Sequence, residues 1–172
     1  MSSDQTRFFS IFIIEKRHFL KPILFFLLFI TSFRPALVLG QHASSNKDFI
    51  ADILKYVNEH RRSIGLNALT MNDVICKEAE THSKNMASGR VPFSHNGFDG
   101  RTSRIKAKLK NVNAWAENVA FGPATARDVV DLWLNSPGHR KNIEGSYNLT
   151  GIGIAQGKDG TLYYTQIFIN KQ

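Results

Sequence analysis

Residues 151–170 read GIGIAQGKDGTLYYTQIFIN, and this stretch decides the fold class. Ile152 and Ile154 alternate with glycines, and residues 162–170 (LYYTQIFIN) are rich in β-branched and aromatic side chains, which favour strands. Residues 157–160 (GKDG) between them have the composition of a hairpin turn. The stretch therefore predicts a β-hairpin near the C-terminal end of the chain.

Upstream of the hairpin, apolar residues recur with helical spacing. Apolar residues at positions 49, 50, 53, 54 and 57 predict a helix that ends near Gly65. Asn72 is a typical N-cap for a second helix, which stops at Gly89 and has Ile75, Ala79, His82 and Met86 on its apolar face. Because the helices come first and the hairpin last, we expect an α+β fold.

The middle of the chain gives weaker signals. Residues 91–100 contain Pro and two Gly and predict a loop, residues 101–110 fit a short basic helix, and residues 116–122 fit a strand or a turn. Thr125 and Asp128 have the spacing of a capping box. They open a further helix, which the pair Pro137-Gly138 is expected to end.

The first 40 residues differ from the rest of the 172-residue chain. They hold eight of the 13 Phe, and residues 23–30 (ILFFLLFI) form an apolar core behind a basic flank. A basic flank, a short apolar core and a small residue at the end are typical of a secretory signal peptide. We expect cleavage near Gly40, with 41–48 as a linker and 49–172 as a single domain; an uncleaved anchor is the alternative. Arg34 interrupts the apolar stretch before the roughly 20 residues that a membrane span needs.

Composition is consistent with an exported globular domain. Hydrophobic residues make up 42% and charged residues 21% of the chain, close to a globular average. The formal charge of +8 falls to +5 once the net +3 of residues 1–40 is removed. Cys76 is the single cysteine, so the fold contains no internal disulfide, and we expect a small buried side chain rather than a nucleophile.

Basic residues gather between positions 101 and 110, namely Arg101, Arg104, Lys106, Lys108 and Lys110. They predict a solvated helix face or a surface for anionic lipid, wall polymer or glycan. Nucleic acid is disfavoured by the predicted export and by the absence of interleaved aromatic residues.

Three polar residues stand out by their surroundings. His95 lies in a Gly-bordered loop, Glu117 in a segment of small residues, and His139 directly after Pro137-Gly138. Two imidazoles and a carboxylate suffice for a zinc site completed by water. The spacing alone does not show that they converge, and surface loop residues are the other interpretation. His82, on an apolar helix face, is expected to be a hydrogen-bonded core histidine, and Ser94 and Ser136 lack the context of a serine nucleophile.

Read together, five segments resemble, in order, those of the CAP superfamily (cysteine-rich secretory proteins, antigen 5, pathogenesis-related 1; SCP domain). They are AETHSKNMA, FSHNGFDG, ENVAFG, WLNSPGHRKNI and TGIGIA…YYTQIF, and they span about residues 49–170. The likeness is closest to the disulfide-free bacterial branch. It implies an α-β-α sandwich.

The resemblance also implies a cleft lined by two histidines and two acidic residues. His95, Glu117 and His139 match three of these positions, whereas the second acid is missing near Trp133. Asp131, one helical turn earlier, is the nearest replacement. The resemblance favours an exported, non-catalytic binding module for a lipid, peptide or cell-envelope component, with Zn²⁺ as a candidate cofactor. A metal-assisted hydrolase that uses the same cleft and a secreted structural or signalling ligand are the alternatives.

Overall fold

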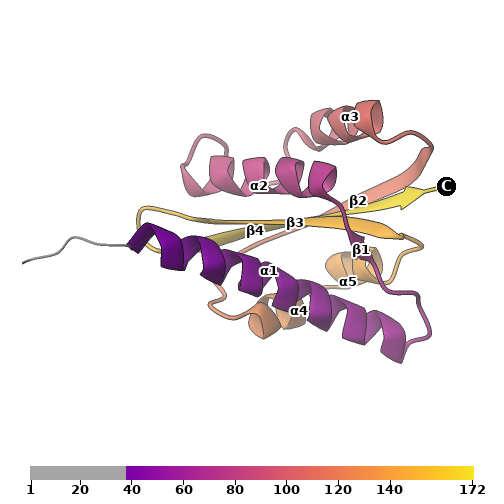
Figure 1. Ribbon diagram of the computed structural model, residues 1–172, viewed down its shortest axis with the longest axis horizontal. Coiled ribbons are helices and arrows are strands. Elements are labelled where there is room, and N and C mark those ends of the chain that lie inside the picture. Colours follow the sequence, from indigo (N-terminus) through magenta and orange to yellow (C-terminus); the bar gives the residue numbers. More distant parts are fainter. Residues whose placement is uncertain (1–37) are drawn as a thin grey trace, which may run out of the picture. The chain divides into compact units, whose positions relative to one another are not determined.

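This computed structural model describes the backbone of residues 38–172 and the side chains of residues 46–172 (Figure 1). The signal-peptide features of residues 1–37 lie outside the described residues, so the leader and its cleavage stay predictions. Within the described part, no helix combines the length and the apolar character that crossing a membrane requires.

A four-stranded mixed sheet forms the centre of the domain, in the order β1-β3-β4-β2. The predicted hairpin is confirmed as β3 (Leu149–Gln156) and β4 (Leu162–Lys171), which pair antiparallel with Ile154 opposite Tyr164. On the other side of β4 lies β2 (Val112–Phe121), also antiparallel, so the ambiguous segment 116–122 is mostly strand. The short β1 (Thr70–Met71), which the sequence did not predict, pairs parallel with the start of β3.

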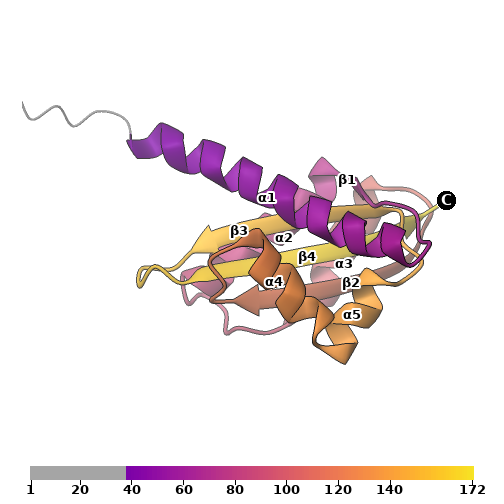
Figure 2. The ribbon, with the colours of Figure 1, turned by 90° about the horizontal axis from the view of Figure 1, so that it is seen from below.

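Helices cover both faces of this sheet. One face carries α2 (Asp73–Ala87) and α3 (Phe98–Lys108), and the other carries α1 (Val38–Ser63), α4 (Ala126–Leu134) and α5 (Pro137–Ile143) (Figures 1 and 2). The expected single-domain α+β fold with an α-β-α sandwich is therefore confirmed.

Capping side chains explain where two of the helices begin. Asn72 Oδ1 accepts hydrogen bonds from the Val74 and Ile75 N–H groups and so starts α2. Thr125 Oγ1 accepts from the Asp128 N–H at 3.1 Å, as the capping box requires. The Asp128 carboxylate, however, accepts from the Thr125 hydroxyl at 2.7 Å instead of from a backbone N–H.

Two boundaries differ from the expectation. Residues 41–48, expected to be a linker, belong to α1, because they contain neither Pro nor Gly to interrupt a helix that continues from residue 49. Pro137 does more than follow α4: it begins α5, since the fixed φ of proline suits the first position of a helix.

Apolar side chains fill both spaces between the sheet and the helices. Trp133, Tyr164 and Phe168 are fully buried on the side of α1, α4 and α5. A smaller cluster on the side of α2 and α3 consists of Ile75, Ala79, Ile105, Ile167 and Ile169. Burial of this apolar surface is the main stabilising contribution, at about 25 cal/mol per Å².

The glycines of β3 let α2 approach the sheet at backbone distance. A Cβ atom at Gly151 would overlap backbone atoms of Ile75 and Cys76, and one at Gly153 would overlap backbone atoms of Ala79 and Glu80. The alternation of glycine and isoleucine in β3 therefore has a simple cause. One face of the strand carries a helix in direct backbone contact, and the other supplies Ile152 and Ile154 to the core.

Candidate functional site

Glu117 lies on β2 and is the centre of the candidate site. Only 5% of the residue is exposed. Its Oε1 lies 2.9 Å from His95 Nδ1 and accepts a hydrogen bond from Arg101 Nη2 at 2.7 Å. Its Oε2 accepts from Arg101 Nε at 2.8 Å. The structure thus brings His95 and Glu117 together as the resemblance implied, and both carboxylate oxygens have partners.

His95 is held by the loop between α2 and α3. The carbonyl of the preceding Ser94 lies 2.9 Å from Nε2 of His82, and Arg101 Nη1 donates to the Asn96 carbonyl at 2.9 Å. His82 is 3% exposed, which confirms the expectation of a hydrogen-bonded core histidine. The His95 side chain itself remains 50% exposed, so its ring is available to a ligand.

His139 lies on α5, on the other face of the sheet, and its main chain is linked to β2 next to Glu117. Asn142 of α5 donates to the Glu117 carbonyl at 3.1 Å and to Asn118 Oδ1 at 2.8 Å, while Asn118 donates to the His139 carbonyl at 3.0 Å. Burial lowers the pKa of His139, and the neighbouring His95 lowers it further. The Nδ1 atom of His139 is buried without a hydrogen-bond partner among the described residues.

Arg101 is a site residue that the sequence did not predict. The sequence predicts either a solvated helix face or a surface for anionic ligands at this position, but Arg101 is only 5% exposed and forms a buried ion pair with Glu117. The spacing of four residues between Arg101 and the buried Ile105 is the signal that places it on the inner face of α3.

The remaining basic residues of 101–110 stay at the surface. Arg104 donates to Glu78 Oε2 through Nε at 3.0 Å and Nη2 at 2.8 Å, and the Lys106 ammonium lies 3.9 Å from the centre of the Trp115 ring. The predicted basic face is therefore narrower than expected and centres on Lys106, Lys108 and Lys110, which carry no carboxylate partner within the described chain.

The arrangement does not fit a zinc site with three protein ligands. Zinc would need a free Glu117 oxygen beside the two imidazoles, but Arg101 and His95 engage both oxygens. Over residues 46–172, whose side chains the structure describes, no group of three His, Cys, Asp or Glu side chains is placed to hold a metal ion. Zinc binding stays a prediction.

Other sequence candidates lie away from this centre. Ser94 Oγ donates to the Pro92 carbonyl and accepts from the Asn96 N–H. Cys76 is half-buried on α2, and burial raises the pKa of its thiol. Asp131 lines a hollow between α1 and α4 together with Tyr56 and His60, so it does not replace the missing acid.

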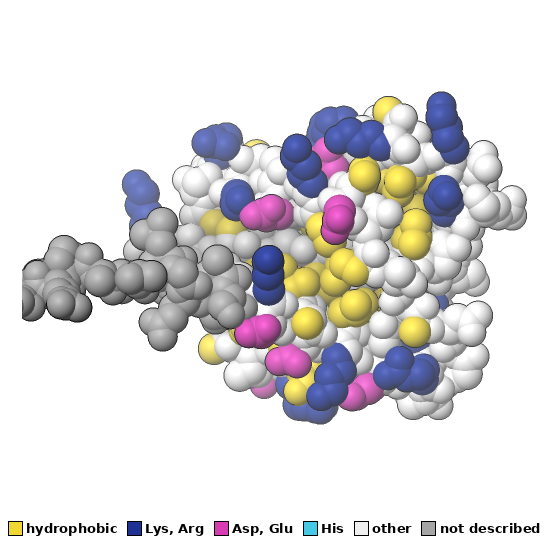
Figure 3. Space-filling model, viewed as in Figure 1, with side chains coloured by type: hydrophobic (Ala, Val, Ile, Leu, Met, Phe, Trp, Pro, Cys, Tyr) yellow, Lys and Arg dark blue, Asp and Glu magenta, His cyan; other side chains and the backbone are white. Residues whose placement is uncertain are grey.

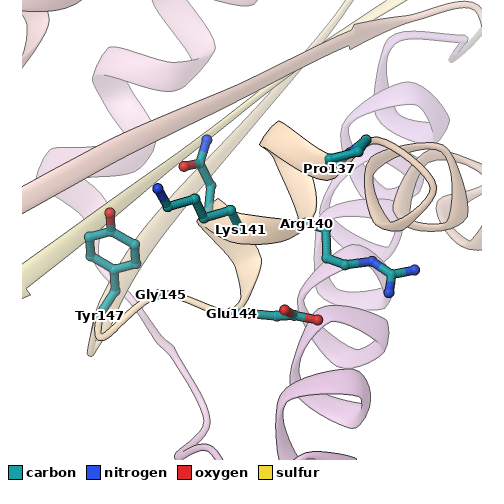
Figure 4. A pocket seen from close by; sticks show the side chains of 7 residues that line it. Pro137, Arg140, Lys141, Glu144, Gly145 and Tyr147 are labelled. Atoms are coloured by element: carbon teal, nitrogen blue, oxygen red, sulfur yellow. The ribbon is translucent and has the colours of Figure 1, made fainter.

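A separate hollow of about 500 Å³ lies beside α5 (Figure 4). It is lined by Pro137, Arg140, Lys141, Asn142, Glu144, Gly145 and Tyr147. Below it, the buried Arg61 donates to the carbonyls of Ile143, Gly145 and Tyr147 and so holds the chain after α5. None of His95, Glu117 and His139 lines this hollow, which is therefore distinct from the candidate site.

A mixed sheet between two helical layers, with a histidine-flanked carboxylate on its edge strand, defines an α-β-α sandwich of the CAP type. The model of the cysteine-rich secretory protein family (CAP) matches residues 54–168, and the chain belongs to this family. The absence of a disulfide agrees with the disulfide-free bacterial branch.

Bacterial proteins are among its relatives. The chain is 31% identical over 130 residues to the uncharacterized protein YkwD of Bacillus subtilis, covering 74% of this chain and 49% of the relative. A second relative, an uncharacterized membrane protein of the same organism, is 30% identical over 69% of this chain and 34% of its own length. The chain thus spans about half or less of the curated relatives it matches.

Solved structures show the same fold. An extracellular protein with an SCP domain from Bacillus anthracis is 26% identical, with a TM-score of 0.63 over 79% of this chain and 45% of that one. An outer surface protein of Borrelia burgdorferi, 22% identical, has a TM-score of 0.66 over 74% of this chain and 96% of that one.

Proposed function

We propose that this protein is an exported binding module whose predicted cleft, around His95, Glu117, Arg101 and His139, holds an anionic group of a cell-envelope component. One observation carries the proposal: Arg101 neutralises the carboxylate of Glu117 within the protein. The groups left for a ligand are the half-exposed ring of His95 and the residue His139, which is partly exposed although its Nδ1 atom is buried.

The same observation argues against a hydrolase. A general base must take a proton from water, and its efficiency depends on a lone pair that is free to do so. Both oxygens of Glu117 already accept hydrogen bonds from Arg101, and one also faces His95. Glu117 therefore serves to orient His95 and Arg101.

Charge supports an anionic ligand. Residues 41–172 are basic, with a net charge of +5, and Lys106, Lys108 and Lys110 extend the positive surface along and beyond α3. Such a surface attracts anionic polymers or headgroups over about 8–10 Å at physiological ionic strength, and salt weakens the attraction.

The test uses vesicles of phosphatidylcholine with and without phosphatidylglycerol, and sedimentation of the bound protein at pH 6. We expect binding only to the anionic vesicles, and a several-fold loss in the variant His95→Ala/His139→Ala. The matched control is His60→Gln, whose ring pairs with Glu144 away from the cleft. A variant of the basic face, Lys106→Gln/Lys108→Gln/Lys110→Gln, should chiefly reduce the dependence of vesicle binding on the salt concentration.

Two results would contradict the proposal. Unchanged binding by the folded double-histidine variant would remove the cleft from recognition. A lower melting temperature of His95→Ala with unchanged binding would instead favour a structural or signalling role, in which the cleft residues only stabilise the fold.

A further inference from the structure

The outer edge of β3 is open along most of its length. β1 pairs only with Leu149 and Thr150, after which the chain turns into α2. Within residues 38–172, no strand lies beside residues 151–156 on this side. An open strand edge presents unpaired N–H and C=O groups that can pair with another chain.

The hydrogen bonds to β1 show which main-chain groups point outward. The Thr70 N–H donates to the Asn148 carbonyl at 3.0 Å, and the Asn72 N–H donates to the Thr150 carbonyl at 2.9 Å. Because the direction of main-chain N–H and C=O groups alternates along a strand, those of Ile152 and Ile154 point outward as those of Thr150 do. The Ile152 main chain lowers the pKa of the Cys76 thiol, although burial raises this pKa by more, so the outward side of Ile152 lies close to Cys76. Among the described residues, nothing pairs with the outward N–H and C=O groups of Ile154.

This edge forms the floor of a groove of about 700 Å³ between α1 and α2. Ile50, Cys76, Ile152, Ile154 and Ala155 line it with apolar surface. Figure 3 shows apolar side chains in this groove, with acidic and basic side chains on both sides. An edge strand at the bottom of an apolar groove is the geometry of β-strand addition, in which main-chain bonds supply affinity and pockets supply specificity.

The charged side chains at the two ends of the groove differ in sign. Gly151 lies against Cys76, and Gly153 against Glu80, so α2 runs along β3 and places Asp73 at the Thr150 end.

Lysines occupy the opposite end of the groove. Lys84 lies one helical turn after Glu80, with which it forms an ion pair at 2.5 Å. Phe49 stacks on Tyr164, which pairs with Ile154 in the sheet. Lys47 precedes Phe49 by two residues and therefore lies near the Ile154 end of the groove. Lys47 forms no ion pair within the described chain.

We propose that the open edge of β3 binds an extended peptide of a partner protein, about six residues long, which adds to the sheet as a further strand. Its side chains toward the groove are small and apolar, a basic residue faces Asp73, and an acidic residue faces Lys47. This surface is separate from the predicted histidine cleft, because Glu117 lies on β2, at the opposite edge of the sheet. The inference does not depend on the function proposed above.

Two synthetic peptides, acetyl-KVTVTE-amide and acetyl-EVTVTK-amide, cover the two possible strand directions. Titrated into the ¹⁵N-labelled protein, one of them should shift the Ile154 amide resonance and slow its hydrogen exchange at least tenfold. The control is the same peptide with N-methyl groups on the edge-facing residues, which removes the donors but keeps the side chains. We expect it to bind at least about tenfold more weakly, since each hydrogen bond contributes about 1 kcal/mol.

Matched variants locate the binding surface. Lys47→Glu should weaken binding of the tighter peptide about threefold, whereas Lys55→Glu on the same helix, outside the groove, should leave it unchanged. Alkylation of Cys76 with N-ethylmaleimide should block the groove, and the Cys76→Ser variant given the same treatment should still bind. His95→Ala should bind as the unmodified protein does. No shift at Ile154 with either peptide, or equal affinity of the N-methylated control, would overturn the proposal.

Discussion

Arg101 and Glu117 form a bidentate ion pair, with Nε 2.8 Å from Oε2 and Nη2 2.7 Å from Oε1. Both residues are buried and come from different layers, α3 and the sheet. The pair therefore ties the helix to the edge strand and holds His95, whose ring contacts Glu117, in a defined orientation.

We expect Arg101→Met to lower the free energy of unfolding by about 3–5 kcal/mol, because it leaves the buried Glu117 carboxylate without its cation. The double variant Arg101→Met/Glu117→Leu should recover part of this loss, since neither charge remains. Urea unfolding of the two single variants and the double variant forms a double-mutant cycle. A loss below about 1 kcal/mol in Arg101→Met would contradict the role of the pair.

Zinc calorimetry tests whether the Glu117 carboxylate is paired with Arg101 in solution. We expect the unmodified protein to bind no stoichiometric zinc, because Glu117 is paired, and Arg101→Gln to bind more tightly because the carboxylate is released. His95→Ala/His139→Ala in the Arg101→Gln background is the control. One equivalent of zinc on the unmodified protein, lost in His95→Ala/His139→Ala, would show that the metal displaces Arg101.

The pH dependence of stability should reflect the buried His82. Burial lowers its pKa below the ordinary 6.5, and the charge of Arg101 lowers it further. Between the lowered pKa and 6.5 the unfolded chain binds more protons than the folded one, so stability decreases as the pH falls below 6.5. Urea midpoints from pH 8 to pH 5 should fall less steeply in His82→Gln, which keeps a donor for the Ser94 carbonyl. His60→Gln controls for the loss of one histidine, and equal slopes in all three proteins would contradict the assignment.

The close approach of α2 to β3 predicts that a single added methyl group strongly lowers the free energy of unfolding. Gly153→Ala would place a Cβ atom on backbone atoms of Ala79 and Glu80, so the helix or the strand must shift. We expect a loss of at least about 3 kcal/mol, at the upper end of overpacking costs. The control is Gly138→Ala in α5, where nothing lies within 4 Å and where alanine should stabilise the helix by about 0.5–1 kcal/mol. Thermal unfolding of both variants measures the contrast.

Local signals in the sequence were reliable where the cause of the structure is local. Asn72 and Thr125 cap helices through their own side chains, and the turn at residues 157–160 joins two strands that are close in sequence. The short β1 was missed because its partner within the described chain is β3, about 80 residues away. Pro137 was interpreted as a stop, although it also starts the next helix.

The candidate site shows the same division. Glu117, His95 and His139 were singled out from their surroundings and from a family resemblance, and the contact of His95 with Glu117 agrees with that choice. The sequence by itself determined the α+β class, the helix caps, the hairpin and the family. Only the tertiary structure decided that Arg101 turns inward to neutralise Glu117, and that most of the β3 edge stays open. Both outcomes depend on contacts between segments distant in the chain, and local composition carries no information about which of them meet.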